Sequence, residues 1–309
     1  MLKDCQANGR FIGTVLVTEW RESPFRQKIG SFIVLTCQDA SLSLSAKIWE
    51  VEPQHIEWLN THAVFLVTAS CSEYRGNLEL SIESLQPLSP EEIQWEALLP
   101  SSPFTEEQLE ERLLRLLGEI EDPELQELLG RVLSHPEWGK AYRLAPAAVK
   151  VHQAYLRGLW EHSLGVAELA LTLTGHYPEA DRELVLAGAL LHDLGKIQEY
   201  AYEKGIQYTT DGRLLGHIIM GVEMLSREMA QISTFSSERR LKLLHILTSH
   251  HGRYEWQSPR RPKCIEAVIV HYADALEAEL WQFKQAREHH PEEEWSPYVK
   301  SMERYLYLR

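Results

Sequence analysis

Residues 187–200 read AGALLHDLGKIQEY, and this stretch decides how the rest of the chain is interpreted. An apolar run leads directly into His192 and Asp193, and Lys196 follows within one helical turn. The run predicts a buried helix, in which an unpaired carboxylate would cost several kcal/mol. A bound cation is therefore the natural partner of Asp193, and Lys196 is placed to reach a phosphate beside that cation.

Helical apolar spacing continues on both sides of this stretch. It predicts helices over residues 161–174, 182–200, 215–229, 238–250 and 264–288. Imidazole and carboxylate side chains lie at the ends or inner faces of these helices: His162, His192, Asp193, His217, His250, His251 and Asp274. Such a set suits Mn, Fe, Co or Zn, and Mg where carboxylates dominate. We therefore predict an all-α, metal-binding domain over residues 151–309.

The N-terminal part alternates in the manner of β-strands. Five short runs with polar breaks cover residues 11–17, 31–35, 44–49, 63–67 and 78–82. They predict a small five-stranded barrel of the OB kind over residues 1–88, with an SH3-like barrel as the alternative. Tyr74 and Arg75, beside the last turn, are candidates for contacting nucleic-acid bases. The predicted fold class is thus a multidomain α and β protein.

Charge is distributed unevenly along the chain. The net charge is −14, and residues 89–150 alone carry 13 acidic against 6 basic side chains. This segment is predicted to be an acidic helical linker, with helices over residues 106–117 and 123–133. A general basic surface is missing, so a polyanionic partner would have to be held by local patches and metal ions.

One such patch follows the His250-His251 pair. It combines aromatic residues with four basic ones, Arg253, Arg260, Arg261 and Lys263. Backbone phosphates and stacked bases are bound by such a mixture, so we predict that these four residues bind substrate.

The cysteine and hydropathy patterns bear on the cellular compartment of the protein. The four cysteines are scattered without a CxxC pair, and the N-terminus has no apolar leader. No apolar run is long enough to cross a bilayer. We expect a cytoplasmic protein that does not contact membranes, and we leave open whether it forms a homo-oligomer.

The motifs resemble those of the HD phosphohydrolase superfamily, and in particular of the YhaM-type 3′→5′ exoribonucleases. Besides HDLGK, the blocks AYLRGLWEHSLGV, YTTDGRLLGHIIMGVEML, LLHILTSHHGRYEWQSPRRPK and EAVIVHYADALEAEL carry the resemblance. That family also has an N-terminal OB domain, and AKIWE and YRGNLELSI are similar to its strands. The resemblance departs from the family pattern at Arg157, which stands in a usual glycine pair, and at Glu277, which replaces an aspartate.

The resemblance implies a site with two divalent ions. Mn is the first expectation, with Fe, Co, Mg or Zn as alternatives. It implies that His162, His192, Asp193 and Asp274 bind one ion, and that Asp193 bridges to a second ion held by His217, His250 and His251. A hydroxide activated between the ions would attack phosphorus, and Lys196 would stabilise charge on the phosphate oxygens. Asp193 and Lys196 are thus the expected catalytic residues.

The sequence is compatible with three functions. The first is a metal-dependent 3′→5′ exonuclease that hydrolyses the phosphodiester bonds of single-stranded RNA, with single-stranded DNA as a further substrate. The second is an HD phosphohydrolase acting on a small nucleotide, and the third is a non-catalytic single-strand-binding protein. The predicted barrel and the resemblance favour the first, and the seven ligand-type residues argue against the third.

Overall fold

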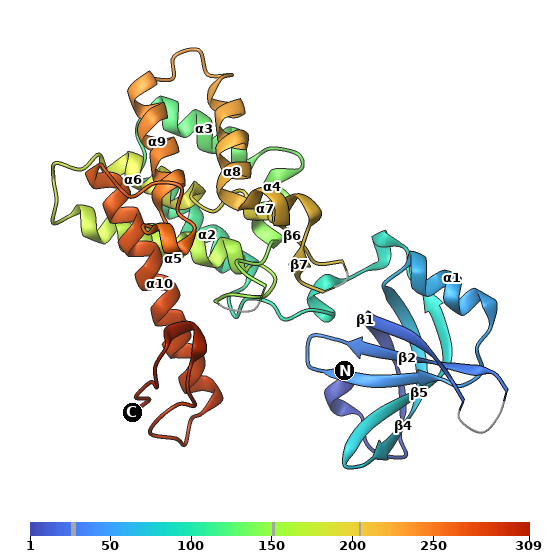
Figure 1. The fold of residues 1–309 in the computed structure, drawn as a ribbon. Helices are drawn as coiled ribbons and strands as arrows, with labels where there is room; N and C mark the ends of the chain where they lie inside the picture. Colours follow the sequence, from blue (N-terminus) through green and yellow to red (C-terminus); the bar gives the residue numbers. More distant parts are fainter. Residues whose placement is uncertain (26–28, 150–151, 204) are drawn as a thin grey trace. The chain divides into compact units, whose positions relative to one another are not determined.

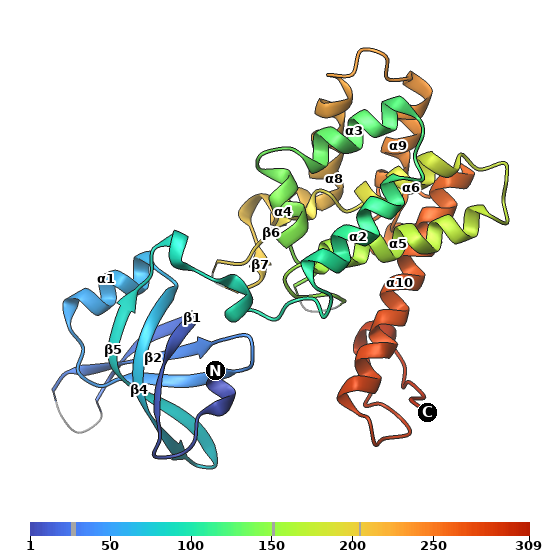
Figure 2. The same cartoon turned by 180° about the vertical axis from the view of Figure 1, so that it is seen from behind.

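The computed structural model describes residues 1–25, 29–149, 152–203 and 205–309. The chain divides into two compact units. Residues 1–101 and 202–207 make the barrel unit, and residues 102–201 and 208–309 make the helical unit. Figures 1 and 2 show these elements from opposite sides.

The barrel unit is built on five strands. They are β1 (Arg10–Pro24), β2 (Ser31–Gln38), β3 (Ser43–Ile48), β4 (Val64–Tyr74) and β5 (Asn77–Pro87), with helix α1 (Pro53–Thr61) between β3 and β4. The strands close in the order β1-β2-β3-β5-β4. β3 pairs with β5 in parallel, and the other neighbours are antiparallel. The predicted five-stranded barrel is confirmed, although α1 was not predicted.

Alternating side chains fill the barrel. Ile33 and Leu35 on β2, Phe65 and Val67 on β4, and Leu80 on β5 are almost completely buried. Their spacing of two residues puts them on the inner face of a pleated strand, which leaves the intervening residues on the outside. The barrel therefore has an apolar interior and an outer surface on which polar and aromatic side chains are presented.

The helical unit contains nine helices among the described residues. They are α2 (Glu106–Leu117), α3 (Pro123–Leu133), α4 (Trp138–Leu144), α5 (Gly158–Thr174), α6 (Arg182–Leu191), α7 (Lys196–Glu199), α8 (Thr210–Met229), α9 (Ser237–Ser249) and α10 (Ile265–His289). Two short strands, β6 (Tyr200–Ala201) and β7 (Gln207–Tyr208), pair with each other in a separate two-stranded sheet. The predicted helical fold of the C-terminal region is confirmed, and α2 and α3 begin and end at the predicted residues.

Helix α6 lies at the centre of this unit. Every residue from Leu184 to Leu191 is buried, as expected for a helix that is apolar on all sides. α5, α9 and α10 pack around it, and α2, α3 and α4 share the same apolar core, so the segment predicted as a linker packs with the helices that follow it (Figure 2). The core holds the helix ends that carry the predicted site.

One predicted helix is shorter than expected. The sequence predicts a single helix over residues 182–200, but α6 ends at Leu191, residues 192–195 form turns, and α7 begins at Lys196. The prediction of one continuous helix is wrong. The apolar spacing continues through the break, so the spacing alone does not reveal it. The turns redirect the chain where His192 and Asp193 occur.

Within the described residues, no helix combines the length and the apolar character that a bilayer crossing requires.

Candidate metal centre

The turn at residues 192–195 brings the chain close to α8. A Cβ atom on Gly195 would lie 1.9 Å from the carbonyl oxygen of His217, so only glycine permits this approach. Gly216 precedes His217 with φ of 73° and ψ of 155°, a positive-φ conformation that favours glycine and interrupts α8. These two glycines bring His217 to the end of α6, where its Nε2 lies 3.4 Å from Asp193 Oδ1.

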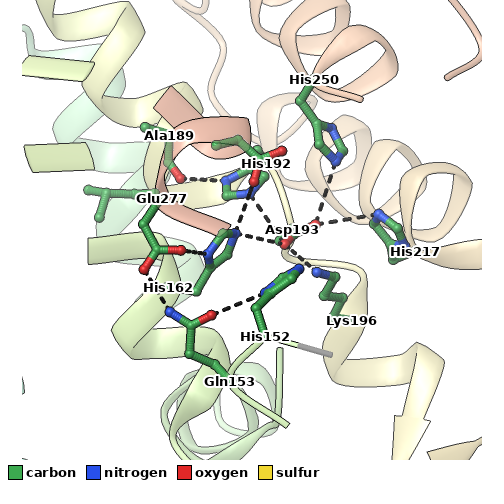
Figure 3. Close-up of polar contacts among 12 residues, drawn as sticks. His152, Gln153, His162, Ala189, His192, Asp193, Lys196, His217, His250 and Glu277 are labelled. Atoms are coloured by element: carbon green, nitrogen blue, oxygen red, sulfur yellow. Dashed lines mark hydrogen bonds and ion pairs between the residues drawn. The ribbon is translucent and has the colours of Figure 1, made fainter. Parts of the chain in front are cut away.

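Asp193 lies between two groups of imidazoles (Figure 3). The Nε2 atoms of His162 and His192 are 3.5 and 3.3 Å from its Oδ2. Those of His217 and His250 are 3.4 and 3.6 Å from its Oδ1. The carboxylate is 2% exposed, so each oxygen faces its own pair of imidazoles in a buried setting.

The seven predicted residues come together in two adjacent clusters. In each cluster the ligand atoms lie within 4.8 Å of one another: His162, His192 and Asp193 in one, and His217, His250 and His251 in the other. Asp274 of α10 joins the first cluster, with its Oδ1 3.2 Å from His162 Nε2 and 3.8 Å from His192 Nε2.

Each imidazole is oriented through its Nδ1 atom. The acceptors are Glu277 for His162 (2.6 Å), the carbonyl of Ala189 for His192 (2.7 Å), Glu199 for His217 (3.1 Å), the carbonyl of Leu247 for His250 (2.8 Å) and the carbonyl of Trp256 for His251 (2.8 Å). Carbonyl and carboxylate oxygens only accept hydrogen bonds, so Nδ1 carries the hydrogen. The Nε2 lone pairs are then free for a metal ion.

Several of these atoms have no hydrogen-bond partner among the described residues. They are the buried Nε2 atoms of His162, His192, His217 and His250, together with Asp193 Oδ1. Buried polar atoms are normally hydrogen-bonded, so such a group of unpaired acceptors calls for a cation. Neutral imidazole with carboxylate fits a divalent metal ion of the Mn, Fe, Co or Zn type.

The surrounding charges support the same conclusion. Burial opposes the ionisation of Asp193, but Lys196 and His192 outweigh it and hold the pKa of Asp193 well below its usual value. Burial also opposes a charge on His162, yet Glu277 and Asp274 raise its pKa to about 10. The carboxylates therefore favour a positive charge at His162 Nε2, either a proton or a metal ion.

Lys196 is 6% exposed and points into the centre. Its Nζ lies 2.6 Å from Asp193 Oδ2, whereas the carboxylate of Glu199, three residues further on, accepts from His217. Both Asp193 and Lys196 line a cavity of about 220 Å³, which also borders Asp274. The ammonium therefore stands where a ligand entering this cavity would meet it.

Two carboxylates of the site were not assigned by the sequence. Glu277 lies one helical turn after Asp274 and also accepts from the side chain of Gln153, at 2.6 Å. Glu199 ends α7 and accepts from both the ring and the backbone N–H of His217. The spacing of Glu277 from Asp274 was the available signal, whereas no pattern linked Glu199 to His217.

His152 is a further residue that the sequence did not indicate. It lines the 220 Å³ cavity, and its ring centroid lies 5.0 Å from that of His162. Burial and the neighbouring His162 lower the pKa of His152 to about 3. It is therefore a neutral side chain on the wall of the centre.

The predicted substrate-binding residues are dispersed. Arg253 and Arg261 line a cavity of about 830 Å³ beside the centre, which shares Trp256 and His271 with the smaller one. Arg260 and Lys263 are exposed and are not among the described residues that line these two cavities. Tyr74 and Arg75 belong to the barrel unit, where the guanidinium lies 5.3 Å from the Tyr74 ring centroid.

Replacing Glu277 by alanine should weaken metal binding about 10- to 100-fold, because His162 would lose the acceptor that fixes its tautomer. Competition with a chromophoric chelator measures this affinity. Glu279→Ala is the matched control. It removes a carboxylate of the same helix, and among the described residues Glu279 lines the 830 Å³ cavity but not the 220 Å³ cavity. Equal affinity in wild type and Glu277→Ala would contradict the positioning role.

Comparison with known proteins gives consistent matches. The HD domain family matches residues 159–279. The 3′-5′ exoribonuclease YhaM of Bacillus subtilis is 31% identical over 273 residues, covering 88% of this chain and 86% of that protein. The protein of the same name from Oceanobacillus iheyensis is 33% identical over 250 residues, covering 81% and 78%. A crystal structure of the L. monocytogenes phosphodiesterase PgpH HD domain aligns with 48% of this chain and 74% of that one, at 23% identity and a TM-score of 0.32, which is too low to show a common fold.

Proposed function

We propose a function for this chain, which belongs to the family of YhaM 3′-5′ exoribonucleases. The protein is a metal-dependent nuclease that hydrolyses the phosphodiester bonds of single-stranded RNA from the 3′ end. The observation that carries this function is the set of buried, unpaired Nε2 atoms around Asp193. These atoms call for bound cations, and the cavity lined by Asp193 and Lys196 would give a phosphate access to those cations.

Two divalent ions fit the donor set, with Mn as the first candidate. His162, His192 and Asp274 would hold one, His217, His250 and His251 the other, and Asp193 would offer one oxygen to each. When bound, such ions activate water near neutral pH and withdraw charge from a phosphate. The Nδ1 contacts keep the imidazoles oriented, so that little reorganisation is needed on binding.

Lys196 has the second chemical role. Its ammonium lies in the cavity above Asp193, where it would bind a non-bridging phosphate oxygen. The negative charge on these oxygens is balanced there by a fixed cation in a buried setting, which is where such stabilisation is strongest. His152, held neutral, would line the path without adding charge.

The barrel supplies a surface suited to unpaired bases. Trp49 is 45% exposed and stacks on Phe32 at 5.1 Å, and Lys47 Nζ lies 5.5 Å from the Trp49 ring and 5.3 Å from the Tyr74 ring. Aromatic faces flanked by cations bind single strands without regard to sequence. We propose that this surface, with Arg75, binds part of the RNA strand.

The basic patch should be visible in the salt dependence of RNA binding. Replacing Arg253 and Arg261 together should make the log–log salt slope shallower by about 1.4, because each phosphate contact on a single strand contributes roughly 0.7. Replacing Arg260 and Lys263, which lie outside the cavity lining, should change the slope less. Fluorescence anisotropy over a salt series measures both. A larger change for the second pair would place the strand on another surface.

The polarity and the substrate are tested with end-labelled RNA and Mn²⁺. A 5′-labelled strand should shorten stepwise, while a 3′-labelled strand should release its label at once as a mononucleotide. The same strand made of DNA shows whether the sugar matters. Intact RNA alongside a hydrolysed free nucleotide would contradict the proposal and favour a phosphohydrolase of small nucleotides.

A further inference from the structure

Trp256 lines three cavities at the metal centre. It borders the 220 Å³ cavity above Asp193 and Lys196. It also borders the 830 Å³ cavity with Arg253 and a cavity of about 690 Å³ formed by Tyr200, Tyr208 and the start of α8. A strand that reaches the centre through either of the larger cavities therefore passes the indole ring.

The backbone of Trp256 is tied to the centre. Its carbonyl accepts from Nδ1 of His251 at 2.8 Å, so the residue that presents the indole also orients a candidate ligand. The loop that follows is anchored where the backbone N–H of Arg260 donates to the carbonyl of Thr248 near the end of α9, at 2.9 Å. The backbone of Trp256 is thus held beside the centre by hydrogen bonds that do not involve the indole ring.

The indole itself is accessible to a ligand. Trp256 is 50% exposed, which is unusual for so large an apolar side chain beside a buried site. The His271 ring lies 6.4 Å away at 49°, so it does not stack on the indole. The guanidinium of Arg253 lies 4.7 Å from the ring centroid and brings a cation to the same place.

We propose that Trp256 stacks on a nucleobase that flanks the scissile phosphate. Stacking on an aromatic ring works for every base, and the adjacent Arg253 would contact the phosphate backbone. A base within a duplex has both faces covered by its neighbours, so this contact favours an unpaired strand. The inference rests on the proposed function, since it assigns a further contact to the same RNA substrate.

Trp256→Ala tests the contact because the mutation removes the ring and keeps the carbonyl that holds His251. Wild type should degrade intact RNA roughly 5- to 100-fold more efficiently than RNA whose last two nucleotides are abasic. The variant should lose this preference through a higher KM, with kcat and metal content close to wild type, because stacking binds ground state and transition state alike. Trp256→Phe should restore part of the preference.

Tyr254→Ala is the matched control. It removes a ring of similar exposure, 56%, from the same turn. The described residues that line the three cavities do not include Tyr254. This variant should keep the wild-type preference for intact ends. A Trp256→Ala variant that still discriminates like wild type, or that loses kcat together with bound metal, would overturn the proposal.

Binding of RNA with a 3′-terminal 2-aminopurine and phosphorothioate linkages gives an independent readout. Wild type should quench the 2-aminopurine fluorescence, and Trp256→Ala should quench it several-fold less. Equal quenching would overturn the stacking contact. A wild type that degrades no RNA but shows this difference would instead refute the proposed exonuclease function and leave the contact intact.

Discussion

Replacing Asp193 by asparagine should reduce RNA hydrolysis by at least about 1,000-fold. The two oxygens of Asp193 face separate imidazole pairs, so the loss of its charge affects both candidate ion sites. Metal ions contribute several kcal/mol of transition-state stabilisation, and each 1.36 kcal/mol is worth about tenfold in rate. Single-turnover degradation of 5′-labelled RNA measures the loss, and elemental analysis should show less bound metal.

The stability of this variant must be followed in parallel. Asparagine leaves the buried Lys196 ammonium without its ion-pair partner at 2.6 Å, which destabilises the fold in its own right. Asp274→Asn is a second variant that leaves this pair intact, and it should also lose most activity. A folded Asp193→Asn protein that binds the wild-type amount of metal and cleaves at the wild-type rate would refute the central role of Asp193.

His162→Ala and His217→Ala should each remove one ion. The two imidazoles belong to different clusters, so each variant should retain roughly half of the wild-type metal content and cleave RNA at least about 100-fold more slowly. Metal analysis after gel filtration, paired with the RNA assay, measures both. His176→Ala, at an exposed position beyond the end of α5, is the control and should behave as wild type.

A different outcome would distinguish one ion from two. If His162→Ala lost all metal while His217→Ala lost none, the centre would hold a single ion at the first cluster. If both variants kept full metal and full activity, neither cluster would bind the catalytic ions.

The clustering of the seven site residues was foreseeable because each stands next to a helix end or on a buried face. His192 and Asp193 end an apolar run, and Asp274 lies on the inner face of a long amphipathic helix. Periodicity places such residues on the core side of their helices, and polar residues there need a partner. The pattern thus indicated the chemistry before the geometry was known.

The break after Leu191 was beyond the reach of the pattern. Apolar spacing runs on through Ile197, and the reason for the break is tertiary, since Gly195 packs against the carbonyl of His217. α1 and α4 were missed because they are only 9 and 7 residues long. Periodicity needs several turns to stand out from chance.

The acceptors behind the imidazoles could not be assigned from sequence either. Glu277 meets His162 across 115 residues, and Glu199 meets His217 across 18. Such pairs are fixed by how α10 packs on α5 and how α7 packs on α8. The same holds for Trp256, whose sequence position shows an aromatic residue in a basic loop, whereas its place among three cavities depends on the packed structure.

Anomalous diffraction from crystals grown with Mn²⁺ tests the central claim most directly. Two peaks should appear on opposite sides of the Asp193 carboxylate. One should contact His162, His192 and Asp274, and the other should contact His217, His250 and His251. A single peak, or peaks away from Asp193, would contradict a centre in which this carboxylate joins two metal ions.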